Sequence, residues 1–371
     1  MVDEFNLKQS RIKALMVEKG IDALVLNKVS SFAWATCGAP SYVATSTTDG
    51  VASLVVLSPK GASSPALYLV TNNIEAPRLE KEEQLKKQGW EFIVQPWYEA
   101  ATGLQDLLSG CRVGADGAMP GASNLASDLA RLRSQLTEEE GERFRRLGRL
   151  CAGAMEDTMS SIRPGQSEQE IAAELARFSE VRGVQPVAIM VAADERIFAY
   201  RHPIPKENRL KHYALVILCG RKWGLVCSIT RAVHFGRLPK ELEQKMHAAA
   251  KVDSVFIHHT RPGQTLGSIF AQAQAAYAET GYAQEWQLHH QGGSAGYEPR
   301  EFVAVPESLE QVSIGQAFAW NPTIQGAKCE DTILVSSSGY EVLTEIPGWP
   351  MIEVSVGAAN YRRPAIREMP A

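Results

Sequence analysis

The sequence of 371 residues contains no long hydrophobic run. Its longest apolar stretches have the length of a β-strand, whereas a helix that spans a bilayer needs about 20 apolar residues, so we expect no membrane segment. The first residues, Met1 to Phe5, do not form the basic and then apolar leader of a secretory signal. Six cysteines occur without a paired spacing, which predicts reduced thiols and a cytoplasmic protein.

Neither sign of charge dominates the composition. Lysine and arginine number 38 and aspartate and glutamate 42, which gives a formal net charge of −4. Nucleic acids and anionic membranes attract proteins with an excess of positive charge, so the composition predicts neither partner. Hydrophobic residues make up 45% of the chain, and its length is sufficient for two domains with separate cores.

A change of pattern near residue 134 divides the chain. Helical and strand patterns alternate before it, which predicts an α/β domain over residues 1–134. The expected elements of this domain are helices near Leu7–Lys19 and Ile74–Lys87, and strands at Ala23–Leu26, Ala52–Leu57, Ala66–Val70, Glu91–Val94 and Arg112–Gly114. Thr137 and Glu140 then form a capping box before an amphipathic helix, so we expect a second domain over residues 135–371.

The second domain contains an internal repeat. The segments Arg163–Ser167 and Arg261–Thr265 read RPGQS and RPGQT, and each lies between two helical patterns. Two copies of a helix-turn-helix unit before strands predict a duplication, and a pseudo-twofold domain of this kind has a natural cleft on its axis. A chance match is the alternative, because Pro-Gly turns are common.

The candidate site residues lie in four short stretches of the second domain. His202 and Pro203 precede two apolar runs, Tyr213–Gly220 and Trp223–Arg231, which predict a β-hairpin. The other three stretches are His289–Gly293 with Tyr297–Pro299, Ala319–Pro322, and Lys328–Val335. The last of them starts a strand with Glu-Asp-Thr.

In this order the stretches resemble the pita-bread superfamily, which includes creatinase, prolidase, aminopeptidase P and methionine aminopeptidase. The resemblance depends on Thr-Arg at the end of the hairpin, a histidine before a glycine pair, and Glu-Asp-Thr at the start of a strand. It implies an α/β (α+β) protein in which a creatinase-like N-terminal α/β domain precedes a pita-bread domain with an internal pseudo-twofold repeat. It also implies a homodimer.

The metallopeptidases of this superfamily place five metal ligands on these elements: two aspartates on the hairpin, one histidine and two glutamates. In this chain the corresponding positions hold Ile217 or Leu218, then Ser228, His290, Asn321 and Glu330. Only a histidine and a glutamate remain, whereas a hydrolytic metal site needs about three protein ligands and an open position. We therefore predict no metal and no other cofactor, with a divalent metal as the alternative.

Creatinase is the precedent in this superfamily for hydrolysis without metal. It lacks the hairpin aspartates, and it uses a loop histidine at the position of His202 to cleave a C–N bond of a small cationic molecule. The resemblance thus implies a metal-independent hydrolase that acts on a small polar metabolite, with His202 as general acid and base. The predicted catalytic residues are His202, His290 and Glu330, and the predicted substrate-binding residues are Asn321, Tyr297, Arg231 and Ser228.

Two other functions stay open. One is a divergent metallopeptidase of the Xaa-Pro aminopeptidase or prolidase type, and the other is a non-catalytic module that binds a small ligand. The candidate residues also have structural interpretations, such as a buried ion pair of Glu330 with His290, Arg231 or Lys328. Because side chains alternate along a strand, we expect the thiols of Cys219, Cys227 and Cys329 to face away from the site.

Overall fold

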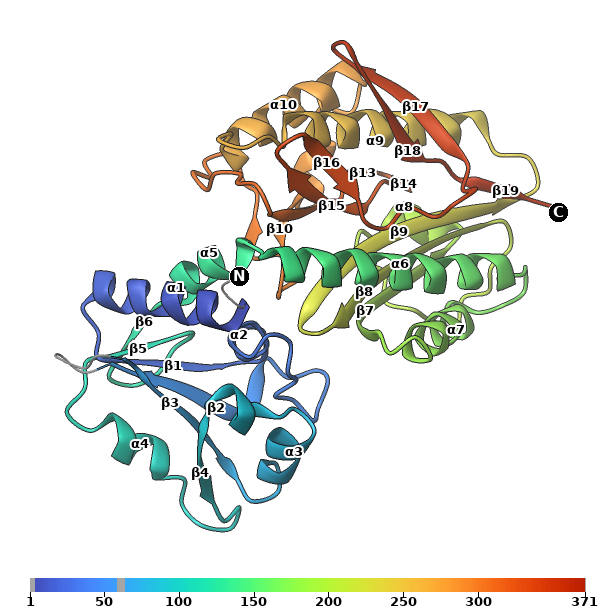
Figure 1. Ribbon diagram of the computed structural model, residues 1–371. Coiled ribbons are helices and arrows are strands. Elements are labelled where there is room, and N and C mark those ends of the chain that lie inside the picture. The colour runs from blue at the N-terminus through green and yellow to red at the C-terminus, as the bar shows by residue number, and fades with distance from the viewer. Residues whose placement is uncertain (1–3, 59–63, 371) are drawn as a thin grey trace. The chain divides into compact units, whose positions relative to one another are not determined.

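The computed structural model describes residues 4–58 and 64–370 (Figure 1). The chain divides into two compact units, Met1–Arg133 and Ser134–Ala371. Within the described ranges, no helix combines the length and the apolar character needed to cross a membrane.

The first unit is built on one mixed sheet with the strand order β4-β3-β2-β1-β5-β6. Its strands are β1 (Ala23–Lys28), β2 (Asp49–Leu57), β3 (Ala66–Asn72), β4 (Glu91–Gln95), β5 (Val113–Ala115) and β6 (Ala122–Asn124). Its helices are α1 (Glu4–Lys19), α2 (Val29–Ala35), α3 (Ala76–Lys81), α4 (Gly103–Leu108) and α5 (Ala126–Ser134), with a 3₁₀ turn η1 (Leu85–Gln88). The α/β character predicted from the sequence is confirmed.

Two details of the first unit differ from the sequence prediction. The single helix expected near Ile74–Lys87 is divided into α3 and η1, because Gln84 between them has a φ of 55° and cannot continue a right-handed helix. Helix α2 was not predicted. All seven of its residues are buried, so it has no polar face that would give a helical pattern.

The second unit contains a four-stranded sheet, β19-β9-β8-β7, and a five-stranded sheet, β11-β10-β12-β15-β16 (Figure 1). Its helices are α6 (Glu138–Ser161), α7 (Glu168–Glu180), α8 (Glu195–Ala199), α9 (Lys240–His259) and α10 (Leu266–Glu279), with a 3₁₀ turn η2 (Glu285–Leu288). Its strands are β7 (Gln185–Ala193), β8 (Tyr213–Lys222), β9 (Leu225–Phe235), β10 (Gly292–Ala295), β11 (Phe302–Val303), β12 (Ala317–Trp320), β13 (Thr323–Ile324), β14 (Ala327–Lys328), β15 (Asp331–Ser336), β16 (Gly339–Val342), β17 (Met351–Val356), β18 (Ala359–Pro364) and β19 (Arg367–Met369).

The repeated pentapeptides occupy equivalent places in the second unit. The backbone N–H groups of Gly165 and Gly263 each donate to a carbonyl of a later segment at 2.8 Å, and both glycines have a positive φ, of 92° and 87°. Ser167 and Thr265 then cap α7 and α10 through their side-chain oxygens. The two segments thus share the contacts that the predicted duplication requires.

The β8–β9 hairpin fixes which side chains face the site. Its turn, Trp223–Gly224, has positive φ at both residues, as a tight two-residue hairpin turn requires. The register pairs Cys219 with Ser228. Since side chains alternate along a strand, Ile217 shares their face and Leu218 points to the other. Of the two positions considered for the first aspartate, Ile217 is therefore the one on the face of Ser228.

Candidate active site

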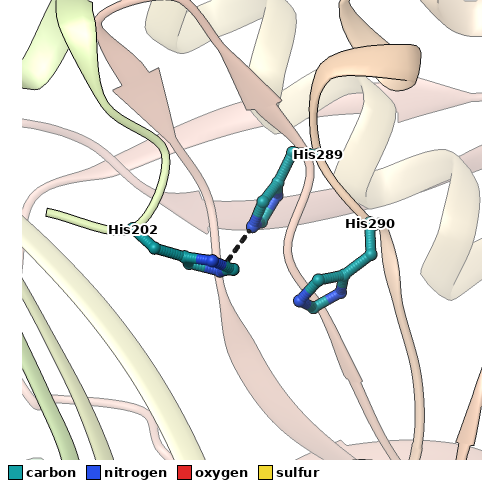
Figure 2. Close-up of side chains that lie close together, drawn as sticks. All are labelled: His202, His289 and His290. Atoms are coloured by element: carbon teal, nitrogen blue, oxygen red, sulfur yellow. Dashed lines mark hydrogen bonds between the residues drawn. The ribbon is translucent and has the colours of Figure 1, made fainter.

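Three imidazoles converge in the second unit, and we call them the histidine cluster (His202, His289 and His290; Figure 2). His202 lies on the loop before β8, whereas His289 and His290 lie between η2 and β10. The Nε2 atoms of His202 and His289 are 2.9 Å apart. One ring nitrogen of each histidine lies within 4.8 Å of the others. The sequence analysis missed His289 as a site residue, although it adjoins His290.

The surroundings keep the histidine cluster uncharged. Burial and the charge of Lys328 lower the pKa of His289 to about 2. Burial and the charge of Arg300 lower the pKa of His290 to about 4. The pKa of His202 is lowered from 6.5 by the same kinds of cause, burial first and then Lys328. The site therefore presents neutral imidazoles near neutral pH, which can accept a proton or bind a cation.

A threonine fixes the tautomer of His289. The hydroxyl of Thr323 donates its only hydrogen to the backbone carbonyl of Asn321, at 3.0 Å. The same oxygen lies 3.2 Å from Nδ1 of His289, so it accepts a hydrogen bond from that N–H. Nε2 of His289 consequently carries a lone pair, and it accepts a hydrogen bond from Nε2–H of His202.

Close backbone packing fixes the start of β10 beside the cluster. The N–H of Gly292 donates to Nδ1 of His290 at 3.3 Å. Gly292 has a φ of 98°, and a Cβ there would lie 2.1 Å from the carbonyl oxygen of Ala319. Only glycine allows this approach.

A second group of polar side chains surrounds Glu330, and we call it the Glu330 cluster (Ser228, Thr230, Arg300, Lys328 and Glu330). Glu330 is 2% exposed, and its Oε1 accepts a hydrogen bond from Arg300 at 3.0 Å. Its Oε2 accepts from Thr230 at 2.5 Å and pairs with Lys328 at 2.9 Å. Burial alone would raise the pKa of Glu330, but the charges of Lys328 and Arg300 outweigh it and lower the pKa to about 2. Each oxygen of this carboxylate thus already contacts a cation, and Oε1 keeps a second lone pair.

Arg300 is the residue that the sequence analysis missed in the Glu330 cluster. Its guanidinium donates both to Glu330 and to the hydroxyl of Ser228, at 3.2 Å. Ser228 lies in turn 3.4 Å from the thiol of Cys219. The expectation that Cys219 faces away from the site is therefore wrong, because the hairpin register places it on the face of Ser228. Cys329 does face away, toward Asp253.

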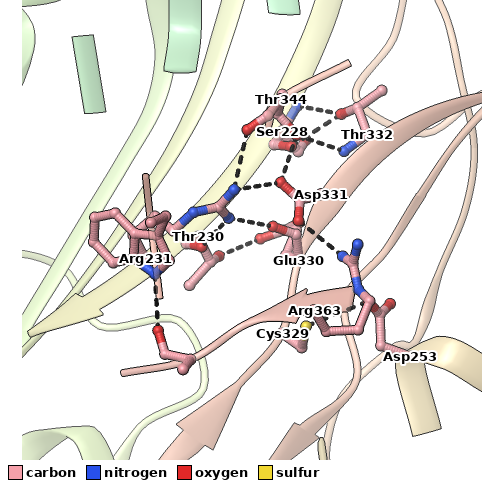
Figure 3. A network of polar contacts seen from close by, with 12 residues as sticks. Ser228, Thr230, Arg231, Asp253, Cys329, Glu330, Asp331, Thr332, Thr344 and Arg363 are labelled. Carbon is pink, nitrogen blue, oxygen red and sulfur yellow. Dashed lines mark hydrogen bonds and ion pairs between the residues drawn. The ribbon is translucent and has the colours of Figure 1, made fainter. Parts of the chain in front are cut away.

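Arg231, a predicted substrate-binding residue, has a structural role. It is 3% exposed and pairs with Asp331 at 2.7 Å, and Asp331 pairs with Arg363 at 2.8 Å (Figure 3). Arg363 continues the network to Asp253, at 2.5 Å. These buried charges compensate one another and tie β9, α9, β15 and β18 together. The prediction that Arg231 binds substrate is corrected accordingly.

The structure also corrects the role predicted for Tyr297. This side chain is 2% exposed, and its hydroxyl donates to the buried carboxylate of Glu140 on α6, at 2.6 Å. This hydrogen bond gives Tyr297 a structural role between β10 and α6. Asn321 is buried as well, but its Oδ1 has no hydrogen-bond partner among residues 4–58 and 64–370. Asn321 thus offers an acceptor that a substrate or a water molecule could use.

The family model for metallopeptidase family M24 matches residues 142–337, more than half of the chain. The chain belongs to metallopeptidase family M24. This match includes the hairpin, the histidine cluster and the Glu330 cluster. The predicted membership of the pita-bread superfamily is thereby confirmed.

Individual proteins similar to this chain in sequence or structure are also named as peptidases. An uncharacterized peptidase of Staphylococcus aureus (strain MW2) is 26% identical over 250 residues, which cover 65% of this chain and 69% of that protein. The Xaa-Pro dipeptidase from Bacillus anthracis has a similar structure, with a TM-score of 0.77, 19% identity, and coverage of 98% of this chain and 100% of that chain. The prolidase from Pyrococcus horikoshii OT3 matches with a TM-score of 0.77, 18% identity, and coverage of 92% and 99%. At these identities the two structures show the fold alone.

The comparisons change the order of the functional hypotheses. The relatives named here are peptidases, so they favour the peptidase alternative and give no support to the creatinase-like, metal-independent hydrolase of the main hypothesis. The family description also argues against the expectation that no metal is bound. Whether the residues of this chain fit a metal depends on the site itself.

The residues at the five ligand positions of the superfamily do not fit two metal ions. Ile217 has no donor atom, and Ser228 donates or accepts only through a neutral hydroxyl. Glu330 retains its carboxylate, but Arg300, Lys328 and Thr230 already contact both of its oxygens. Two side-chain cations therefore contact the carboxylate that a metal ion would have to bind, so these residues do not fit a two-metal centre.

Proposed function

We propose that this protein hydrolyses the amide bond of a small peptide, of the Xaa-Pro type for which its structural relatives are named. One observation supports this most directly: three neutral, converging imidazoles lie within electrostatic reach of two cations in a domain of the M24 family. A proton carrier and a positive charge are the two aids that hydrolysis of an amide needs most.

His202 is the proposed proton carrier. Its side chain is exposed, so substrate and water can reach it, and its Nε2–H is held by His289. An imidazole that accepts a proton from the attacking water can return it to the leaving nitrogen. His289 is the positioning residue that orients His202, because Thr323 holds its tautomer.

Arg300 and Lys328 supply the proposed positive charge. Two cations face one carboxylate in the Glu330 cluster, so the cluster has a net charge of about +1 in a buried setting. Such a charge suits the carboxylate of a dipeptide or the negative charge that develops on a carbonyl oxygen. The small-molecule substrate, the homodimer and the cytoplasmic location expected from the sequence stay predictions.

The test is an assay of the purified full chain with a set of Xaa-Pro dipeptides, read by chromatography of the free amino acids. We expect release of proline from at least one dipeptide and none from the same dipeptides with a D-residue before proline. Saturable dipeptide binding without release, measured by calorimetry, would contradict hydrolysis and leave the non-catalytic alternative. The loss of most ligand positions is the observation that favours that alternative.

A further inference from the structure

We infer that the histidine cluster is a site for a single divalent zinc ion, which shares only His290 with the five ligand positions of the superfamily. His202, His289 and His290 would each contribute one ring nitrogen, and His290 would give up the hydrogen bond that its Nδ1 accepts from Gly292. This inference and the proposed function concern the same side chains. Zinc binding can nevertheless be measured without any enzymatic activity.

The first support is the geometry of the donors. The three candidate nitrogens lie within 4.8 Å of one another, and the ring centroids are 4.6 to 5.6 Å apart. Zinc binds imidazole nitrogen at about 2.0–2.1 Å in a tetrahedral arrangement, which sets the ligand atoms about 3.4 Å apart. The Nε2 atoms of His202 and His289 are 2.9 Å apart, so zinc would replace the hydrogen bond between them, and His202 would ligate once the proton on that nitrogen has moved to Nδ1.

The second support is the outer shell of His289. A ligating histidine usually donates its other ring N–H to an oxygen, which fixes the ring and leaves the ligating nitrogen with its lone pair. Nδ1 of His289 makes this contact with Thr323, whose own hydrogen is committed to the carbonyl of Asn321. The buried member of the cluster is thus already oriented for a ligand at Nε2.

The third support is the combination of donor type and access. Three neutral nitrogen donors with an open fourth position are typical of zinc, whereas magnesium and calcium prefer oxygen. His202 and His290 are exposed, so an ion can reach the cluster from solvent. Arg300 and Lys328 in the Glu330 cluster repel a divalent cation. We therefore expect the site to bind an ion that forms strong bonds to nitrogen, such as zinc, and not one that is held mainly by charge.

The experiment uses the full chain after dialysis against a chelator, titrated with zinc chloride by calorimetry and with cobalt chloride by visible absorption. We expect one ion per chain and the absorption of tetrahedral cobalt. His202→Ala and His290→Ala, both at exposed positions, should each weaken zinc binding by more than about 100-fold, and Thr323→Val by about 10-fold to 100-fold. His247→Ala, at an exposed histidine of α9, is the matched control and should bind like the wild type.

No stoichiometric binding by the wild type, or binding that persists in His202→Ala and His290→Ala, would overturn the inference. Circular dichroism of each variant excludes loss of the fold as the reason for lost binding. The two proposals can fail independently. Zinc binding without peptide cleavage would support the zinc site and contradict the proposed hydrolysis, whereas cleavage without zinc binding would support the hydrolysis and contradict the zinc site. If both hold, added zinc should lower the activity, because it takes the lone pairs through which the cluster handles protons.

Discussion

Glu330→Gln is expected to lower the free energy of unfolding by about 3–5 kcal/mol, which is the usual cost of removing one partner from a buried ion pair. The substitution keeps the size of the side chain but removes the negative charge between Lys328 and Arg300, which are both buried. Lys328 is 4% exposed and would be left as a charge without a counterion. Urea denaturation of the variant and the wild type, both with excess chelator, measures the difference.

Two further variants make this result specific. Adding Lys328→Met to Glu330→Gln removes the uncompensated cation, so the double variant should be more stable than Glu330→Gln alone. Glu353→Gln, at an exposed carboxylate of β17, is the control and should change stability by less than about 0.5 kcal/mol. If Glu330→Gln left the stability with chelator unchanged and lowered it only after manganese was added in place of chelator, Glu330 would be a metal ligand and the ion-pair account would be wrong.

His202→Ala is expected to lower kcat on a cleaved dipeptide by about 10²-fold to 10⁴-fold, the typical contribution of a positioned general acid or base. KM should change little, because the proposed carboxylate contacts come from Arg300 and Lys328. The side chain is exposed, so the fold should be unaffected. Steady-state kinetics with the metal-free full chain separate the two parameters.

The pH profile distinguishes proton transfer from a merely structural effect of His202. Burial and the charge of Lys328 lower the pKa of His202 below 6.5, so its base form predominates at pH 7. Activity of the wild type should therefore be constant near neutrality and fall as the pH drops through this lowered pKa. His202→Ala should retain a slow reaction without this acid limb. An unchanged kcat, or an unchanged acid limb, would exclude His202 as the proton carrier.

The elements that position the site could be predicted because their patterns are strong. The two apolar runs before and after Trp223 became β8 and β9, and the repeated Pro-Gly turns became equivalent caps of α7 and α10. The capping box at Thr137 opens α6. Each of these signals is local, since a turn, a cap or an apolar run determines the backbone near its own position.

The contents of the site were harder to predict, because they depend on register and on loops. Cys219 was assigned to the wrong face of the sheet, because the first aspartate position could fall on either of two neighbouring residues. A shift of one residue along a strand moves every side chain to the opposite face. Arg300 lies in an irregular segment whose sequence gives no period. Lys328, by contrast, was among the ion-pair partners expected for Glu330, and it forms that pair at 2.9 Å.

Side-chain cations, and not two metal ions, surround Glu330 in this structure. Crystals of the full chain grown with manganese and measured at an anomalous wavelength test it most directly. We expect Arg300 and Lys328 in contact with the carboxylate of Glu330 and no anomalous peak within bonding distance of its oxygens. Two peaks bridged by Glu330, with Arg300 displaced, would contradict the account.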